Sequence, residues 1–486
     1  MRHMKRFFGL FLALFSVVSV AQQTDYVDFK VIEAAIFFNE IQVDSTLFDS
    51  FEVKFDILKE VDSIYLNAVE MRFENVSVNG ETANYSNDGK KLIIYNKFKP
   101  SVDNKLEFIF FASPKKAMYF VGWDNEARNQ IWTQGQGKYT SHWLPSIDDM
   151  NDKIEFDLTF AAPKDFEVIS NGRLIAKLES STYNLWKYDM EKPMSSYLAA
   201  LVVGKYSKKV KTSKSGIPLE MYYYPEDSLK VEPTYRYTKE MFDFLEEEIG
   251  VAYPWQNYKQ VPVHDFLYAG MENTSCTIFS DSFMIDDIAF IDKNYVNVNA
   301  HELAHQWFGD LVTETSGKHH WLQEGFATYY ALLAEKQVFG EDYFYWRLFE
   351  YAEELAAQDR IDKSTALLNP KSSSTTFYKK GAWVLVMLRA KVGDLAFKSA
   401  IRRYLIKHAF GNVETNDFIQ EVENSSGEDL SLFVDKWLKD KSFYYEDAET
   451  LLKTESPFIV EYLMVDCEAS NSKCDYYLDS WLSDEA

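Results

Sequence analysis

Two stretches of the sequence together predict a metal site: HELAHQWFGDLVT at residues 301–313 and WLQEGFA at residues 321–327. His301 and His305 are four residues apart, so on a helix both imidazoles project from one face. Glu302 follows His301 and is rotated away from that face. This placement suits a base that acts on a water molecule, and it does not suit a third ligand.

Glu324 is the candidate third ligand, because residues 306–323 are enough for one loop that brings its carboxylate back to the histidines. Two histidines and one carboxylate leave the fourth tetrahedral position open for water, which is typical of a catalytic zinc. The alternative is an ordinary buried helix with two hydrogen-bonded histidines. His319 and His320 could compete as ligands, but adjacent residues point apart, so we expect both to be loop residues.

Length and charge restrict the class of protein. A chain of 486 residues is too long for one ordinary core, so two or three domains are expected. The formal net charge of -24 argues against nucleic acid as a partner, because phosphates require a basic surface. The charge also disfavours binding to an anionic membrane, and the solubility of an exported protein explains it.

The N-terminus has the layout of a secretory signal peptide. Basic residues precede an apolar run at residues 7–18, and small residues at 19–21 end it. We therefore predict a signal peptide at residues 1–21 and a secreted or periplasmic protein. The alternative is an uncleaved signal anchor. No later stretch has the length of a membrane span, so no stable span is expected after cleavage.

Residues 22–208 are predicted to form a β domain. Apolar and polar residues alternate at residues 51–57 and 154–160, as in half-buried strands. Turn dipeptides separate such runs, at Asn79-Gly80, Asp88-Gly89 and Asn171-Gly172. The pattern favours an antiparallel β-sandwich or saddle.

Residues 209–445 are predicted to be mainly helical, which makes the whole chain a multidomain α+β protein. Apolar residues of 241–249 fall on one helical face, and Gly250 is a suitable stop. Helical spacing recurs at residues 381–392, 397–409 and 430–438. Residues 446–486 are predicted to be a short acidic tail, with a weak strand signal at residues 458–465.

The three cysteines are predicted to have structural roles. Cys467 and Cys474 lie close together in the tail and could form one disulfide after export. Cys276 is expected to be a buried thiol.

These motifs resemble the aminopeptidase N family of gluzincin metallopeptidases, which includes leukotriene hydrolase. Residues 301–313 and 321–327 look like its zinc signature. Residues 269–273 (AGMEN) resemble its GAMEN motif with two letters exchanged. Residues 378–382 (YKKGA) are similar to the segment that carries its catalytic tyrosine, and residues 132–136 (WTQGQ) to the stretch by which the β domain reaches the active site.

The resemblance implies a thermolysin-like zinc catalytic domain that hydrolyses the N-terminal peptide bond of peptides with a free amino terminus. It implies one zinc ion per chain, held by His301, His305 and Glu324. Glu302 would be the general base, and Tyr378 would stabilise the oxyanion. The substrate-binding residues implied are Glu272, Gln136 and Gln134 for the α-amine, with the backbone of Gly270 and Met271 for the peptide chain.

Two other functions stay open. The first is a zinc hydrolase with another substrate, either an endopeptidase or an epoxide hydrolase like the leukotriene branch. The second is a catalytically silent zinc- or peptide-binding protein. Most family members carry a further large helical domain, and only about forty residues follow Phe443. We therefore expect this chain to lack most of that domain, and we do not carry over its substrate-size gating or dimer contacts.

Overall fold

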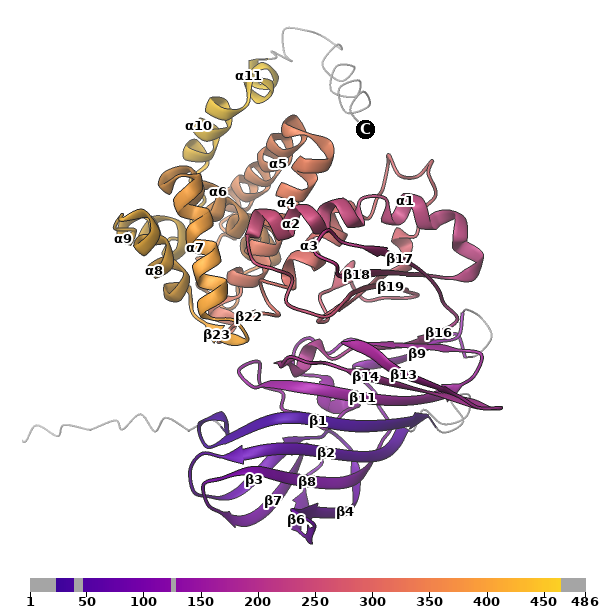
Figure 1. Cartoon of the computed structure of the whole chain (residues 1–486). Coiled ribbons are helices and arrows are strands. Elements are labelled where there is room, and N and C mark those ends of the chain that lie inside the picture. The colour runs from indigo at the N-terminus through magenta and orange to yellow at the C-terminus, as the bar shows by residue number, and fades with distance from the viewer. Residues whose placement is uncertain (1–22, 39–46, 124–127, 465–486) are drawn as a thin grey trace, which may run out of the picture.

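The computed structural model describes residues 23–38, 47–123 and 128–464. The predicted signal peptide and the predicted Cys467–Cys474 pair lie outside these residues. The N-terminal half consists of stacked sheets, and helices dominate the second half, as Figure 1 shows with indigo and magenta strands below orange helices. This arrangement agrees with the predicted order of a β-rich part followed by a mainly helical part.

Three sheets build the N-terminal half. The largest has nine strands, in the order β13 (Arg173–Glu179), β14 (Tyr183–Asp189), β11 (Lys153–Pro163), β1 (Val27–Phe38), β2 (Leu47–Ile57), β8 (Ser101–Ala112), β4 (Arg72–Val78) and β5 (Glu81–Thr82), with β15 (Met194–Ser195) beside β11. A second has β3 (Val61–Asn67), β7 (Lys91–Phe98) and β6 (Asn84–Asn87). The third has β12 (Glu167–Ser170), β16 (Leu201–Gly204), β10 (Gln130–Thr133) and β9 (Met118–Val121).

Alternation along these strands determines which face is buried. In β11, residues 154, 156, 158 and 160 are buried, and residues 153, 155, 157 and 159 are partly exposed. Asn79 and Gly80 both have positive φ, 52° and 80°, as the tight hairpin turn between β4 and β5 requires. Among the described strands of this half, the one parallel pairing joins β1 to β11.

A fourth sheet begins the second half and provides one wall of the candidate site. Its order is β17 (Ser207–Thr212), β18 (Pro218–Tyr223), β19 (Tyr258–Val263), β21 (Cys276–Ser280) and β20 (Gly270–Met271). The two-residue strand β20 is antiparallel to β21 and lies at the sheet edge. Cys276 is a buried free thiol, as expected.

Helices cover this sheet and form the rest of the second half. They are α1 (Val231–Tyr235), α2 (Thr238–Ile249), α3 (Val296–His305), α4 (Trp321–Phe339), α5 (Glu341–Arg360), α6 (Gly381–Val392), α7 (Asp394–Lys407), α8 (Thr415–Ser426), α9 (Ser431–Val434), α10 (Tyr445–Glu455) and α11 (Pro457–Met464). π-helical turns at Thr376–Lys380 and Asp435–Lys439 precede α6 and follow α9. Strands β22 (Val312–Glu314) and β23 (Gly411–Val413) form a small parallel pair. Gly250 ends α2 in the left-handed conformation, with φ 72°.

The weak strand signal at residues 458–465 was wrong, because the described part of this segment forms α11. Pro457 is the first residue of the helix, and the Ser456 hydroxyl accepts a hydrogen bond from the Ile459 backbone (3.2 Å). Ile459 is buried, and Tyr462 packs edge-on against Trp346 of α5. Helical spacing of these apolar residues against α5 therefore outweighs their β propensity.

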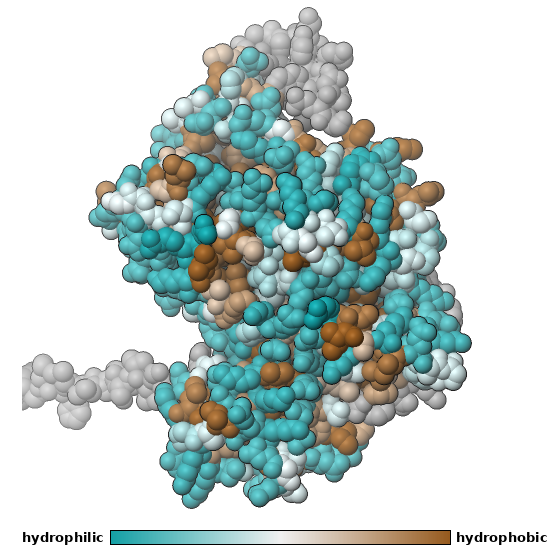
Figure 2. All heavy atoms as spheres, in the orientation of Figure 1, coloured by the Kyte–Doolittle hydropathy of each residue, from teal (hydrophilic) through white to brown (hydrophobic). Residues whose placement is uncertain are grey.

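The surface and the helices carry no sign of a membrane span in the described residues. None of the described helices is both long and apolar enough to cross a bilayer. In Figure 2 most of the visible face is hydrophilic, and its apolar side chains form small separate groups.

Candidate metal centre

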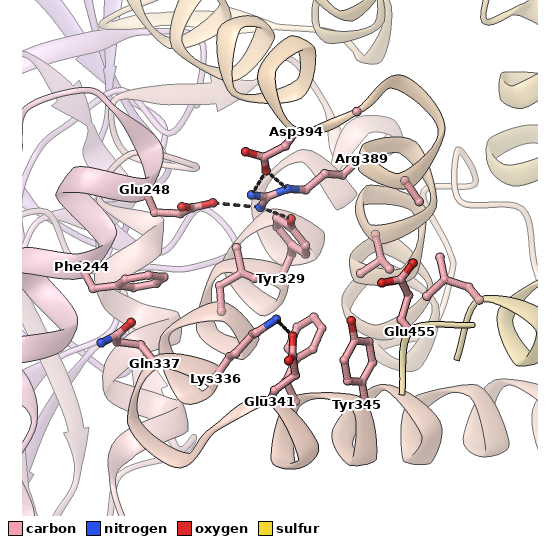
Figure 3. Close-up of a pocket in the computed structure, with 16 residues that line it drawn as sticks. Phe244, Glu248, Tyr329, Lys336, Gln337, Glu341, Tyr345, Arg389, Asp394 and Glu455 are labelled. Carbon is pink, nitrogen blue, oxygen red and sulfur yellow. Dashed lines mark hydrogen bonds and ion pairs between the residues drawn. The ribbon is translucent and has the colours of Figure 1, made fainter. Parts of the chain in front are cut away.

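Two hollows in the helical half differ in chemistry. One of about 680 Å³ lies between α2, α4, α5, α6 and α10. Figure 3 shows that most of its charged side chains pair with each other: Arg389 lies between Glu248 and Asp394, at 2.8 Å from each. Lys336 likewise pairs with Glu341 (2.6 Å). These charges hold the helices together and leave little unpaired charge for a ligand.

The other hollow, of about 360 Å³, contains the predicted metal site. It is lined by β20, α3, α4 and the π-turn before α6, together with Gln136 of the N-terminal half. Among the residues that line it are His301, Glu302, His305, Glu272, Glu324 and Tyr378. Residues far apart in the sequence therefore meet in one cavity.

His301, His305 and Glu324 bring three ligand atoms together. The Nε2 atoms of the two histidines are 3.1 Å apart, and each lies 3.3 Å from Oε2 of Glu324. A tetrahedral metal with bonds of about 2.0–2.1 Å has ligand atoms about 3.3 Å apart. The three donors thus fit three corners of a zinc site, and the fourth corner faces the hollow.

Local structure orients these ligands. His301 and His305 lie one turn apart on α3, and Glu324 lies in the first turn of α4. His305 Nδ1 is 2.9 Å from the carbonyl oxygen of Phe308. This hydrogen bond fixes the ring so that Nε2 points toward the metal position.

Glu302 is buried and lies against the edge strand β20. A Cβ atom on Gly270 would come within 2.7 Å of the Glu302 carboxyl carbon. The AGMEN order of residues 269–273 therefore places glycine where the base needs room. Glu302 does not belong to the three-donor set of His301, His305 and Glu324; its carboxylate instead lies in a second group with Glu272 and His305.

The predicted amine-binding residues divide into two groups. Glu272 is 4% exposed and its carboxylate lies within 4.8 Å of the ligand atoms of Glu302 and His305. Gln136 also lines the hollow. Gln134 does not line it: its Oε1 accepts from the Gln136 backbone (2.6 Å), and its Nε2 contacts Met271 Sδ at 3.3 Å. Gln134 supports the loop, because its side chain is used between that loop and β20.

Tyr378 reaches the metal site from the π-turn. Its ring stacks on the His301 ring, with centroids 5.4 Å apart and an interplanar angle of 6°. Burial, and next to it the charge of Glu324, raises the pKa of Tyr378. The phenol therefore keeps its proton and can donate a hydrogen bond into the hollow.

A close helix contact joins the segments that carry Glu324 and Tyr378. Gly325 and Gly381 meet where α4 crosses the start of α6, and a Cβ atom on Gly325 would lie 2.9 Å from the Gly381 Cα. Glu324 directly precedes one glycine, and Tyr378 lies three residues before the other. The backbone contact thus determines the separation of the carboxylate and the phenol.

Burial raises the pKa values of Glu302 and Glu324, whereas neighbouring histidines lower them, and a different effect dominates at each glutamate. Burial raises the pKa of Glu302 well above its usual value; His305 lowers it, and Glu272 adds to the increase. Burial also raises the pKa of Glu324, but His305 and His301 outweigh burial and hold this pKa well below its usual range. An ionised Glu324 suits a ligand, and a carboxyl group with a raised pKa suits a base that must accept a proton.

Sequence reasoning missed His320 as part of the site. His319 hydrogen-bonds Thr415 (3.0 Å), as a structural loop residue would. His320 instead contacts two carboxylates, Glu314 at 3.2 Å and Glu324 at 3.5 Å. Its position four residues before Glu324 was the available signal, because such pairs share a helix face.

Comparison with protein families matches both halves of the chain. Residues 234–437 match the peptidase family M1 domain, and residues 28–198 match the peptidase M1 N-terminal domain. Aminopeptidase N of Streptomyces lividans is 30% identical over 329 residues, in a match that covers 64% of this chain and 38% of that protein. A probable aminopeptidase 1 of Sulfurisphaera tokodaii is 26% identical over 409 residues, covering 79% of this chain and 50% of that protein. The chain thus spans about half or less of the length of these curated relatives.

Solved structures show the same fold over both halves. A crystal structure of an M1 zinc metallopeptidase mutant from Deinococcus radiodurans, bound to a Tyr-Ser-Ala substrate, superposes with a TM-score of 0.74. The two chains are 19% identical, and the match covers 86% of this chain and 95% of the other. A two-domain M1 zinc metallopeptidase mutant bound to L-tryptophan matches with a TM-score of 0.74 and 20% identity.

Proposed function

Because this chain belongs to peptidase family M1, we propose that it is a zinc-dependent aminopeptidase that removes N-terminal residues from peptides. The observation that carries the proposal is the three-donor set of His301, His305 and Glu324 with two further buried glutamates beside it. Several aminopeptidases are among its relatives, and a related fold binds a Tyr-Ser-Ala substrate.

The donor set supports a single zinc ion per chain. When bound there, Zn²⁺ supplies a Lewis acid that acidifies water and polarises a carbonyl group. Glu302 would accept the proton of the attacking water and deliver it to the leaving amine. Its burial supports this role, because the raised pKa favours holding a proton between the two transfers.

Glu272 would recognise the substrate by its free α-amine. A buried carboxylate binds an ammonium group through charge-assisted hydrogen bonds, and Gln136 adds a neutral acceptor. The free edge of β20, at Gly270 and Met271, would align the peptide backbone as an added strand. The distance between Glu272 and the metal ligands then limits cleavage to the first peptide bond.

Tyr378 would donate a hydrogen bond to the oxyanion that forms on the scissile carbonyl. A preorganised donor in a buried site stabilises developing charge at no cost of reorganisation during the reaction. The stacked His301 ring keeps the phenol in place.

The test compares free and blocked substrates. The purified full chain is analysed for zinc and assayed with a panel of aminoacyl reporter substrates and their N-acetylated counterparts, with and without a chelator. We expect one zinc per chain, chelator-sensitive cleavage of free substrates and at least about 10²-fold slower cleavage of blocked ones. The variant Glu302→Gln should retain zinc and lose hydrolysis.

Two outcomes would contradict the proposal. Equal cleavage of free and acetylated substrates would indicate an endopeptidase. Stoichiometric zinc with no hydrolysis across the panel would indicate a silent binding protein. The panel also identifies the preferred N-terminal side chain.

We also propose that the protein is exported to the periplasm or the medium, on the basis of the signal-peptide pattern of residues 1–21. Cell fractionation with N-terminal sequencing tests this proposal. A mature N-terminus close to residue 22 is expected, and an intact Met1 on a cytoplasmic protein would contradict it.

A further inference from the structure

The two carboxylate oxygens of Glu324 have different partners. Oε2 lies 3.3 Å from Nε2 of both His301 and His305 and therefore faces the metal position. The other oxygen, Oε1, lies 3.5 Å from His320 Nε2. One oxygen is thus available to the metal, and the other is available to the protein.

The second nitrogen of His320 also faces a carboxylate. Nδ1 is 3.2 Å from both Oε1 and Oε2 of Glu314. The ring packs edge-on against Phe377, with centroids 5.1 Å apart and an interplanar angle of 87°. His320 is therefore held on two sides, and Phe377 directly precedes Tyr378.

Glu314 is a rigid support for this histidine. It lies in β22, and its side chain is 3% exposed. Its backbone N–H donates to Gln323 Oε1 (3.3 Å), and its carbonyl oxygen accepts from Asn412 Nδ2 (3.2 Å). Because its backbone is bound from both sides, its carboxylate has little freedom to follow a moving imidazole.

Because Glu324 is buried, the loss of its contact with His320 should affect metal binding. Glu324 is 2% exposed, so Oε1 has little access to water while His320 is in place. A carboxylate without a partner at Oε1 could rotate and present both oxygens to the metal. Outer partners of this kind typically change metal affinity about 10- to 100-fold.

We propose that His320, held by Glu314, is a positioning residue that fixes the Glu324 carboxylate so that only Oε2 binds the metal. The inference rests on the zinc site of the proposed function. It assigns no chemical step to His320, which is not among the residues that line the hollow.

The test measures metal binding directly. The variants are His320→Leu, His320→Gln, Glu314→Gln and the double variant His320→Leu with Glu314→Gln. A matched control is His264→Leu, which breaks a histidine–carboxylate contact with Asp281 (3.1 Å) outside the candidate site. Each full-length protein is titrated with zinc in competition with a chromophoric chelator. The visible spectrum of each Co²⁺ form reports coordination geometry, and melting of each metal-free protein reports folding.

We expect His320→Leu to weaken zinc binding about 10- to 100-fold and to alter the Co²⁺ spectrum. His320→Gln should recover part of the affinity, because its amide can donate to Oε1. The double variant should be little worse than His320→Leu, since Glu314 acts through His320. His264→Leu should bind zinc like the wild type.

Wild-type zinc affinity and an unchanged Co²⁺ spectrum in both His320 variants would overturn the proposal. The proposal would also be overturned if the Co²⁺ spectrum of the wild type indicated an additional nitrogen ligand that is lost in His320→Leu. His320 would then be a metal ligand itself. If His320→Leu does not fold, His320→Gln and Glu314→Gln decide the matter with the same measurements. If the wild type binds zinc but cleaves no peptide, the proposed function is wrong. The role of His320 in zinc binding can still be tested in that case.

Discussion

At the scale of single residues, the balance between burial and neighbouring charges determines the pKa of each of the two glutamates. Glu324 keeps its charge because two imidazoles oppose the effect of burial, whereas burial dominates at Glu302. The same residue type therefore suits the proposed ligand at one position and the proposed base at the other. Neighbouring charges and not residue identity distinguish the two roles.

Glu272→Gln should remove the charge that recognises the α-amine and keep the shape of the side chain. We expect kcat/KM for free aminoacyl substrates to fall about 10- to 100-fold, as the loss of a charge-assisted hydrogen bond predicts. Cleavage of N-acetylated substrates should change little, so the ratio between the two measures the effect. Glu455→Gln, in the hollow of Figure 3, is the matched control. An unchanged ratio would contradict the role of Glu272.

Tyr378→Phe should remove one hydrogen-bond donor and keep the ring that stacks on His301. The expected result is a decrease in kcat of about 10²- to 10³-fold with little change in KM, because the donor acts on charge that develops only in the transition state. Zinc content should equal that of the wild type. Steady-state kinetics and metal analysis measure both quantities. Loss of zinc in proportion to activity would instead assign Tyr378 a structural role.

At the scale of elements, the crossing of α4 and α6 determines how the ligand and the phenol approach each other. Gly325→Ala introduces a methyl group where only 2.9 Å is available to the Gly381 Cα. Because the neighbouring atoms are backbone, the helices must separate. Overpacking of this kind costs about 1–3 kcal/mol of the free energy of unfolding.

We therefore expect Gly325→Ala to lower the melting temperature and to decrease kcat more than zinc affinity, since Tyr378 moves relative to Glu324. Gly317→Ala is the control, because its nearest neighbour, Pro370 Cβ, would be 3.8 Å from the new methyl group. Thermal melting, zinc titration and steady-state kinetics test the pair. Wild-type stability and kcat in Gly325→Ala would show that the contact is not limiting.

At the scale of the whole molecule, β11 joins the two halves close to the site. The Lys153 ammonium donates to the carbonyl oxygen of Asp310 (3.0 Å) and contacts the Thr313 hydroxyl. Asp310 lies in the loop between α3 and β22. The large sheet of the N-terminal half is thus attached to the segment that follows the metal-binding helix.

Asp152, next to Lys153, should make the stability of this junction depend on pH. It is 5% exposed, and burial, followed by the charges of Asp28 and Asp149, raises the pKa of Asp152 to about 8. The unfolded chain releases this proton near the usual aspartate pKa of 3.8, whereas the folded chain keeps it to about pH 8. The folded state therefore binds more protons in this range, and the contribution to stability decreases as pH rises.

Asp152→Asn should remove this contribution, because asparagine does not titrate. We expect the free energy of unfolding to depend less on pH between about 4 and 8. At pH 8 the variant should be about 1–3 kcal/mol more stable than the wild type, because it removes a partly ionised buried carboxylate whose Oδ2 has no hydrogen-bond partner among the described residues. Denaturant unfolding at several pH values measures this, with exposed Asp165→Asn as control. A parallel pH profile for Asp152→Asn and wild type would contradict the assignment.

The spacing of residues along the sequence was sufficient to predict several helices, strands and candidate ligands. The interval between His301 and His305 makes a two-ligand helix face, because the helical repeat alone aligns residues four apart. Period-two alternation predicted β2 and β11 for the same local reason, and Gly250 predicted the end of α2. The roles of Glu272, Gln136 and Tyr378 came from family resemblance, since a single tyrosine or glutamate carries no spacing signal.

Other features of the fold and the candidate site depend on contacts between segments that are distant in the sequence. The sequence of residues 457–464 is compatible with strand and helix, and packing against α5 selects the helix. Gln134 and Gln136 are two residues apart, yet only Gln136 faces the hollow. His320 meets Glu314 only because α4 starts beside β22. Spacing along a chain determines which face a residue occupies, whereas tertiary packing determines what that face meets; the metal ligands follow from the first, and their support follows from the second.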